Sequence, residues 1–311
     1  MRILVTGGLG FIGHGVVKML EDLGQEVIVT DTREVYPPTC QPELNALVAM
    51  RTAKFKNAVV YNVSINDCDS IFEMHKPEIV INFASPSRQQ IVNLNPALHS
   101  ETMSAGLLTL LELSAHHQIK KFVQVSSSMV YGNFVNNTIE HVICNPIGQY
   151  GIMKLAGEML VRDYSRRCGF PYTIVRPSAV YGPLDVKNRV VATFFHTALQ
   201  GGTMQVNGSN EVLDFTYIDD LVPGIVAATR SSTANNKTYN LTRGRGRTLL
   251  EAAKLVQKIV GKGSIEVKDK NRDFPSRGSL NIEAAKKDFG YNPKIDIEEG
   301  FNRYHQWLVQ D

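Results

Sequence analysis

Short apolar runs alternate with longer amphipathic stretches through the first half of the chain. The runs are rich in valine and isoleucine, which is typical of buried parallel strands, and the stretches between them have helical length. The expected strands are residues 3–5, 26–31, 58–62, 78–82, 121–126 and 172–176. The expected helices are one that ends at residue 23, then 65–75, 96–117 and 147–168, with a loop and a short helix in the proline-containing stretch 32–56. Strands that alternate with helices predict one parallel sheet with both faces covered.

The pattern changes after Pro177. The elements expected there are helices 190–200, 218–230, 248–260, 282–289 and 297–308, and short strands 204–206, 215–217 and 237–241. We expect the last of these strands to rejoin the main sheet. The prediction is therefore a first domain at 1–176, with return segments near 214–242, and a smaller, mixed α/β domain at 177–311 that is interleaved with it.

Glycines follow the first strand at once and lead into a helical pattern. Their spacing satisfies G-x-G-x-x-G from Gly8 and T-G-x-x-G-x-x-G from Thr6. In such a loop one glycine permits the turn, another lets backbone approach a pyrophosphate, and Gly13 lets the helix pack closely on the strand. The helix N-terminus then offers free N–H groups to the phosphates. A glycine turn in an ordinary core is the alternative.

The strand 26–31 ends in a carboxylate, Asp31, about twenty residues beyond the last motif glycine. An acid at this place accepts hydrogen bonds from the adenosine ribose and repels a 2′-phosphate, which favours NAD over NADP. Arg33 is a counter-indication, because a nearby arginine accommodates that phosphate. Strand, glycines, helix, strand and acid in this order predict an α/β fold of the Rossmann type, a doubly wound parallel sheet. The smaller domain would complete a substrate cleft at the carboxyl ends of the strands.

Composition excludes several function classes. Of the 311 residues 43% are hydrophobic and 20% charged, as in ordinary globular proteins, and the net charge of +3 comes with no basic run that would suggest nucleic-acid binding. No stretch reaches the length of a membrane span. The four cysteines are Cys40, Cys68, Cys144 and Cys168. Their spacing fits neither a zinc site nor a C-x-x-C pair, so we expect a soluble protein of the reducing cytoplasm.

Candidate chemistry lies in the predicted helix 147–168. The four-residue spacing of Tyr150 and Lys154 places a phenol and an ammonium on one helix face. A free phenol has a pKa of about 10, and both a neighbouring ammonium and an oxidised nicotinamide favour the phenolate that a general base requires. Lys154 is also placed to hold the nicotinamide ribose. Upstream, the strand 121–126 ends in a serine cluster that continues to Ser128. This set suits removal of a proton from an alcohol while hydride leaves its carbon.

Other candidates are weaker. Tyr131 and Tyr181 lack a lysine one helical turn on. His14 is expected to be structural, and His116 and His117 suit the negative end of a helix. We therefore predict no metal site.

These residues together resemble the extended short-chain dehydrogenases/reductases that modify nucleotide sugars. The resemblance covers nearly the whole chain. It rests on the motifs Thr6-Gly-x-x-Gly-x-x-Gly13, Asp31, Ser126-Ser-Ser-Met-Val-Tyr-Gly132, Tyr150-x-x-x-Lys154, Arg176-Pro-Ser-Ala-Val-Tyr-Gly-Pro183, Asp214-Phe-Thr-Tyr-Ile-Asp-Asp-Leu221 and Phe289-Gly-Tyr-Asn-Pro293.

The resemblance implies a cofactor site, a catalytic set and an assembly. It implies NAD held by Gly7, Gly10, Phe11, Ile12, Gly13 and Asp31, with adenine contacts at Asn62 and Val63 and a contact near Ala84. It implies Ser127 as the catalytic serine, Tyr150 as the base and Lys154 as its partner. Relatives are usually homodimers that pack through the two long helices, here near 97–117 and 147–168.

The resemblance also narrows the reaction. The 4,6-dehydratases of this group carry an Asp-Glu pair where this chain has Ser128 and Met129, and methionine cannot transfer protons. We therefore expect transient oxidation at C4 of a nucleotide sugar, as in a UDP-glucose 4-epimerase. A net C4 dehydrogenase or reductase, or a decarboxylase of a nucleotide sugar acid, stays open. A non-catalytic NAD sensor is the third reading, but it has no need of Tyr150 and Lys154.

Two positions depart from the family pattern. Relatives often have asparagine where Ala179 stands and arginine where Leu213 stands, both near the substrate phosphates. Other cations would have to replace these contacts. The residues expected to contact the substrate are Ser128, Arg189 and Arg272, with Arg277 as a further cation.

Overall fold

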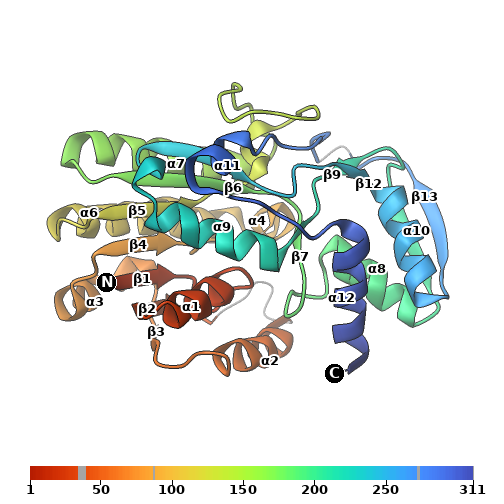
Figure 1. The fold of residues 1–311 in the computed structure, drawn as a ribbon, viewed down its shortest axis with the longest axis horizontal. Helices are drawn as coiled ribbons and strands as arrows, with labels where there is room; N and C mark the ends of the chain where they lie inside the picture. The colour runs from red at the N-terminus through yellow and green to blue at the C-terminus, as the bar shows by residue number, and fades with distance from the viewer. Residues whose placement is uncertain (34–39, 87, 272–273, 311) are drawn as a thin grey trace.

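The computed structural model describes residues 1–311 apart from 34–39, 87, 272–273 and 311. Its centre is a parallel sheet with the strand order β11-β6-β5-β4-β1-β2-β3 (Figure 1). The strands are β1 Arg2–Thr6, β2 Glu26–Asp31, β3 Val59–Asn62, β4 Ile79–Asn82, β5 Lys121–Val125, β6 Tyr172–Pro177 and β11 Lys237–Leu241. The order reverses beside β1, which leaves a crevice at the carboxyl ends of the strands. As expected, the strand at 237–241 rejoins the main sheet, beside β6.

Helices cover both faces of this sheet, because successive strand residues point to opposite faces. Ile3 and Val5 pack in one core with α1 and α9, whereas Leu4 packs in another with α3, α6 and α7. The helices are α1 Gly13–Asp22, α3 Asp69–His75, α6 Leu107–His116, α7 Gln149–Cys168, α9 Ile218–Arg230 and α11 Glu283–Phe289. Short 3₁₀ turns lie at Ile65–Asp67, Ser128–Tyr131 and Ser232–Ala234. The doubly wound α/β prediction is confirmed.

The stretch 96–117, predicted as one helix, is interrupted. Helix α5, Pro96–Glu101, begins where the Asn95 side chain accepts a hydrogen bond of 3.2 Å from the Leu98 N–H. A π-helical turn at Thr102–Gly106 then joins α5 to α6. Such wide turns insert one extra residue into a helix and mark places where packing overrides regular geometry. A helix that we did not predict, α4 Gln89–Leu94, precedes α5.

The stretch 32–56 contains a longer helix than we expected. Helix α2, Gln41–Thr52, makes about three turns and buries Leu47 and Arg51. Pro42 does not break this helix, because it lies in the first turn, where the missing N–H would have no partner. The prolines at 37 and 38 lie outside the described residues.

The C-terminal part has a hydrophobic core of its own, which is built around Phe195 and Phe301. Its helices are α8 Val190–Leu199, α10 Leu249–Val260 and α12 Ile297–Gln310, and its strands β8 Thr203–Asn207 and β13 Ser264–Lys268 pair in parallel. Small strand pairs are β7 Val180–Tyr181 with β10 Thr216–Tyr217, and β9 Val212–Leu213 with β12 Arg247–Thr248. We did not predict β13. The domain boundary after residue 176 stays a prediction.

Within the described part of the chain, no helix has both the length and the apolar content needed to cross a bilayer.

Candidate active site

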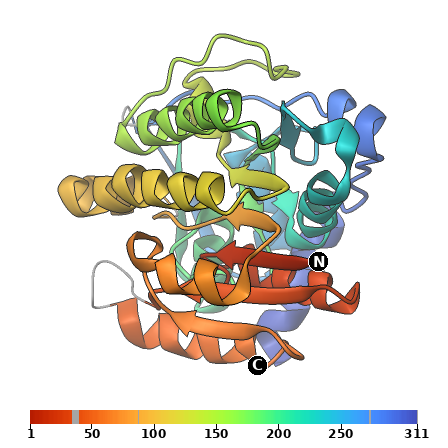
Figure 2. The same ribbon diagram turned by 90° about the vertical axis from the view of Figure 1, so that its left-hand side faces the viewer.

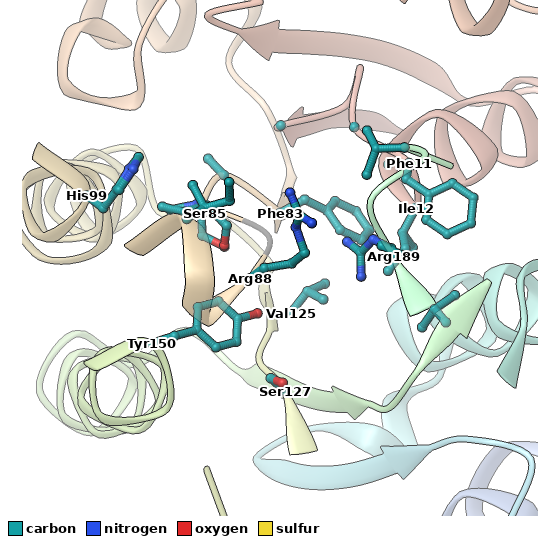
Figure 3. Close-up of a pocket in the computed structure, with 18 of the residues that line it drawn as sticks. Phe11, Ile12, Phe83, Ser85, Arg88, His99, Val125, Ser127, Tyr150 and Arg189 are labelled. Carbon is teal, nitrogen blue, oxygen red and sulfur yellow. The ribbon is translucent and has the colours of Figure 1, made fainter. Parts of the chain in front are cut away.

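A cleft of about 1140 Å³ opens at the carboxyl ends of the main-sheet strands (Figure 3). It is bounded on the other side by residues from the C-terminal part of the chain, among them Arg189 and Leu213. The predicted residues that line it are Gly7, Gly10, Phe11, Ile12, Gly13, Asp31, Asn62, Val63, Ala84, Ser127, Ser128, Tyr150, Lys154, Arg189 and Arg277. The fold thus gathers into one cleft residues that are spread over most of the chain. Arg272, the remaining candidate, lies outside the described residues.

The glycine-rich loop depends on missing side chains. Gly7 adopts a φ of +67°, and a Cβ on it would lie 2.8 Å from the backbone nitrogen of Ala84. A Cβ on Gly13 would lie 2.5 Å from the carbonyl oxygen of Gly7. Neither contact is sterically possible, so these glycines allow β1, α1 and the loop after β4 to approach one another.

The first turn of α1 is suited to an anion. No side chain caps the helix at Ile12, and the first turn contains no acidic residue. Phe11, Ile12 and Gly13 line the cleft, so the positive end of the helix dipole lies beside it.

Asp31 is held in place by the backbone around it. Its Oδ2 accepts a hydrogen bond of 3.1 Å from the Leu9 N–H, and its Oδ1 accepts one of 3.0 Å from the Arg33 N–H. Burial raises the pKa of the Asp31 carboxyl, whereas these two N–H groups and the charge of Arg51 lower it. Each oxygen keeps a lone pair for a ligand hydroxyl. This geometry fits recognition of a ribose at the end of β2.

Tyr150 enters the cleft from the start of α7. Its side chain is buried, and its hydroxyl points into the cleft on the side where Val125 and Ser127 lie (Figure 3). Burial raises the pKa of the Tyr150 phenol, whereas the positive charge of Arg189 and the interaction with the Ser127 hydroxyl lower it. Ser127 is oriented by its own turn, because its Oγ accepts a hydrogen bond of 3.2 Å from the Met129 N–H.

Lys154 lies one helical turn beyond Tyr150, with its Nζ 5.8 Å from the centre of the phenol ring. The ammonium donates a hydrogen bond of 3.0 Å to the carbonyl oxygen of Val125, at the end of β5. Burial lowers the pKa of Lys154 to about 8, and the charge of Glu158 partly opposes this. We expected the ammonium to lower the pKa of the phenol. Instead, burial dominates the pKa of Tyr150, and the cation that lowers it is Arg189.

A charged network that we did not predict lies behind these residues. Glu158 is fully buried and accepts hydrogen bonds from Ser126 Oγ at 2.6 Å and from Arg176 Nη2 at 2.6 Å. Arg162 Nη2 donates a third, of 2.9 Å. The signal that could have revealed Glu158 is its position four residues after Lys154, which continues the face that begins with Tyr150.

The other end of the cleft carries the predicted substrate contacts. Ser128 Oγ donates a hydrogen bond of 3.1 Å to Ser178 Oγ. Arg277 lies against Met129, with its Nη1 4.0 Å from the sulfur, and burial lowers the pKa of its guanidinium to about 10. Ala179 and Leu213, the two departures from the family pattern, also line the cleft. Among the described residues, the arginines that line the cleft are Arg189 and Arg277, together with Arg51 and Arg88, which we did not predict.

His14, His116 and His117 lie outside the cleft lining, whereas His99 of α5 lines the cleft (Figure 3). His14 is buried against Gly10, with Nδ1 3.3 Å from its carbonyl oxygen, and burial lowers the pKa of its imidazole to about 4. Within the described residues, Glu73, His116 and His117 form a group whose ligand atoms lie within 4.8 Å of one another. None of the three lines the cleft.

Comparison with known proteins assigns the family. The model of the NAD dependent epimerase/dehydratase family matches residues 3–242. The chain belongs to this family. Its cofactor is therefore NAD, and the anion-ready start of α1 and the fixed Asp31 carboxylate fit the pyrophosphate and the adenosine ribose of that group.

Members of the family with related sequences span nearly the whole chain. The crystal structure of the UDP-glucose 4-epimerase of Thermotoga maritima with UDP-glucose is 32% identical, with a TM-score of 0.89, and the match covers 100% of this chain and 99% of that one. An uncharacterized UDP-glucose epimerase of Bacillus subtilis is 29% identical over 99% of this chain and 98% of its own length. UDP-glucuronic acid decarboxylase 1 of Arabidopsis thaliana is 30% identical, and the match covers 97% of this chain and 68% of that protein.

Proposed function

We propose that this chain is an NAD-dependent 4-epimerase of a UDP-sugar. The observation that carries the proposal is the convergence of Tyr150, Ser127 and Lys154 on one cleft with the dinucleotide loop at Gly7–Gly13. The relatives named for UDP-glucose epimerisation support the nucleotide and the sugar class.

In this proposal the Ser127 hydroxyl hydrogen-bonds the sugar O4, and the Tyr150 oxygen accepts the O4 proton. The glycine-rich loop and Asp31 would hold NAD, which would supply reversible hydride transfer at the sugar C4. Tyr150 then gives the proton back to O4, so that protons and electrons balance over the cycle. Lys154 would hold the nicotinamide ribose, and the positive charge of Arg189 favours the phenolate of Tyr150. Burial of the Ser127, Tyr150 and Lys154 side chains excludes water, which strengthens these interactions.

The alternatives differ in what happens after oxidation at C4. Dehydration is disfavoured because Met129 follows Ser128 and has no proton to transfer. Decarboxylation of a nucleotide sugar acid is the second candidate, since the decarboxylase of Arabidopsis is among the relatives and the cationic Arg277 beside Met129 suits a carboxylate. A net C4 oxidoreductase is the third.

Product analysis separates these reactions. The purified protein, supplied with NAD, is incubated with UDP-glucose, UDP-galactose and UDP-glucuronate, and the products are followed by chromatography and NMR. Interconversion of C4 epimers without net NADH supports the proposal. Release of CO2 selects the decarboxylase, and steady NADH accumulation selects the oxidoreductase. If no UDP-sugar changes while GDP-, CDP- and dTDP-sugars do, the nucleotide is wrong.

We further propose a homodimer through α5, α6 and α7. These helices pack beside one another on the outside of the sheet (Figure 2, yellow and green), with Gln149 Nε2 donating a hydrogen bond of 2.7 Å to Ser100 Oγ. Apolar side chains on α5 and α7 stay exposed, at 48% for Leu98, 51% for Ile152 and 62% for Met159. Burying them against a second copy would remove this apolar surface from water. Light scattering should show a dimer for the wild type and a monomer for Ile152→Glu combined with Met159→Glu, and a monomeric wild type would refute this.

We also infer a cytoplasmic location. All four cysteines are free thiols in the structure, which suits a reducing compartment. Fractionation of the source cells with an antibody would test this.

A further inference from the structure

One segment of the C-terminal part extends along the cleft. Residues 184–189, which we call the clasp segment, lie between β7 and α8 and end at Arg189, the residue before α8. Asp185, Val186, Asn188 and Arg189 line the cleft. The segment runs from the glycine-rich loop, to which Arg51 connects its first residue, to Arg189, whose charge acts on Tyr150. The clasp segment therefore forms part of the cleft wall, and it is connected to the glycine-rich loop through Arg51.

Three hydrogen bonds fasten the clasp segment to the nucleotide-binding part. Arg51 Nη2 donates a bond of 2.7 Å to the Leu184 carbonyl oxygen, and the Lys187 N–H donates one of 2.8 Å to Glu43 Oε1. Arg88 Nη1 donates a bond of 2.8 Å to the Asn188 carbonyl oxygen. The partners come from α2 and from the loop after β4, more than ninety positions away in sequence.

Arg51 also reaches the glycine-rich loop. Its Nη1 donates a hydrogen bond of 2.8 Å to the carbonyl oxygen of Leu9, so one fully buried guanidinium joins the phosphate loop to the clasp segment. Leu184 has a φ of +68°, a conformation that leucine rarely adopts. Such a backbone persists only when surrounding contacts determine it, as Arg51 does here.

Positive charge accumulates at this place. Arg51, Arg88 and Arg189 surround the buried carboxylate of Asp185, which pairs with Arg189 Nε at 3.0 Å. Burial lowers the pKa of Arg51 to about 10. Burial and the positive charge of Arg189 both lower the pKa of Arg88. The carboxylates of Asp185 and Glu43 offset part of this positive charge, and a bound anion would offset more of it.

The anion that fits is a pyrophosphate. Figure 3 shows the side chains of Arg88 and Arg189 extending into the space between Tyr150 and the turn at Phe11–Ile12. That turn directly precedes α1, whose positive dipole end lies beside the same space. Arginines opposite a helix N-terminus would grip a diphosphate from two sides.

We propose that residues 184–189 form a clasp that retains the bound dinucleotide. Arg88 and Arg189 contact the pyrophosphate, and Glu43 and Arg51 lock the segment onto the nucleotide-binding part. The proposal rests on NAD as the cofactor, and it goes beyond the proposed reaction by naming the residues that set the lifetime of the bound cofactor. A cofactor that returns its hydride to the same sugar gains from such retention, because release in mid-cycle would strand the keto sugar.

The test measures NAD release rather than turnover. Protein loaded with radiolabelled NAD is chased with excess unlabelled NAD, and retained label is followed by rapid gel filtration. Glu43→Ala removes the acceptor for Lys187, whereas Glu43→Gln keeps an acceptor oxygen. Arg88→Met removes a charge and the bond to Asn188 at nearly constant volume. Arg166→Met, an exposed site on α7, is the matched control for the loss of an arginine.

We expect Glu43→Ala and Arg88→Met to release NAD at least tenfold faster than the wild type. Glu43→Gln and Arg166→Met should release NAD at close to the wild-type rate. The urea unfolding midpoints of all four NAD-free variants should match that of the wild type. Release rates within twofold of the wild type in both test variants would overturn the clasp, and so would failure of Glu43→Gln to rescue. Because no sugar is present, that result would leave the proposed epimerase activity untouched. A wild type that epimerises nothing but releases NAD slowly would count against the function alone.

Discussion

The hydroxyl of Ser126 donates a hydrogen bond of 2.6 Å to the fully buried carboxylate of Glu158. Ser126 directly precedes Ser127, and Glu158 lies one turn beyond Lys154 on α7. This bond therefore sets the spacing between the end of β5 and the helix that carries the proposed base. Arg176 completes the arrangement, with a hydrogen bond of 2.8 Å from its Nε to the same carboxylate oxygen.

We expect Glu158→Gln to destabilise the protein by about 3–5 kcal/mol, because it leaves the buried Arg176 without its counter-charge. Ser126→Ala should cost only about 1 kcal/mol and should lower kcat without changing NAD binding. Urea unfolding and steady-state kinetics measure the two effects. Asp163→Asn, which breaks an exposed pair on the same helix, is the control and should leave stability unchanged. Equal stability of Glu158→Gln and the wild type would contradict this role.

Tyr150→Phe should abolish epimerisation while the protein still binds NAD. The substitution removes only the hydroxyl that exchanges a proton with the sugar, and positioned acid–base groups contribute about 10²–10⁴-fold to rates. Turnover is measured by product analysis, and bound NAD by its absorbance after release. A Tyr150→Phe variant with wild-type turnover would rule out Tyr150 as the base and assign that role to another group.

The decrease of kcat at alkaline pH should reflect deprotonation of Lys154. Burial lowers the pKa of this ammonium to about 8, so its positive charge is present at pH 7 and is lost as the pH rises through about 8. We expect kcat to fall across that range. Lys154→Arg, which stays charged, should move the decline to higher pH, and Lys154→Met should show low activity without it. If kcat of Lys154→Arg decreases over the same pH range as kcat of the wild type, another group causes the decrease.

Stability should fall between pH 6.5 and pH 4 because of His14. The pKa of this imidazole is about 4 in the folded chain and 6.5 when exposed, so the unfolded chain binds a proton more readily across that window. Folding stability therefore rises with pH there, by up to about 3 kcal/mol. His14→Gln cannot titrate. The difference in unfolding free energy between wild type and variant should change with pH over this window, and a constant difference would contradict the assignment.

We expect that asparagine can replace Ala179 without loss of stability. Its φ of +39° is unfavourable for alanine, whereas asparagine tolerates left-handed backbone. We expect Ala179→Asn to keep or raise the thermal midpoint and to lower KM for the UDP-sugar through an added amide donor. Ala198→Gly, in the last turn of α8, is the control and should cost up to about 1 kcal/mol. A lower thermal midpoint for Ala179→Asn would show that the amide does not fit.

Much of the fold could be predicted because its signals are local. The buried strands of the main sheet are continuous apolar runs, and the helices between them have regular periodicity. The misses have physical reasons. Helix α2 has a weak apolar face and a proline in its first turn, and β13 is exposed over most of its length. Strand β13 forms because β8 supplies a parallel partner, which no local pattern reports.

The residues of the cleft also differ in how far the sequence alone could predict them. The residues of the glycine loop, Asp31 and the Tyr150–Lys154 pair were predictable, because spacing along one strand or helix determines their geometry. Ser127 and Ser128 were added through the family resemblance and the strand end. All of these line the cleft, and their roles stay predictions until the variants are measured.

The sequence by itself determined the doubly wound sheet, the glycine turn that needs no side chains, and the acid that ends β2, because each follows from neighbours in the chain. Only the tertiary structure decided that Glu158 supports Ser126, that Arg51 joins Leu9 to Leu184, and that burial rather than Lys154 controls the pKa of Tyr150. Hydrogen bonds and desolvation depend on which groups meet in space, and folding brings together groups that the chain keeps far apart.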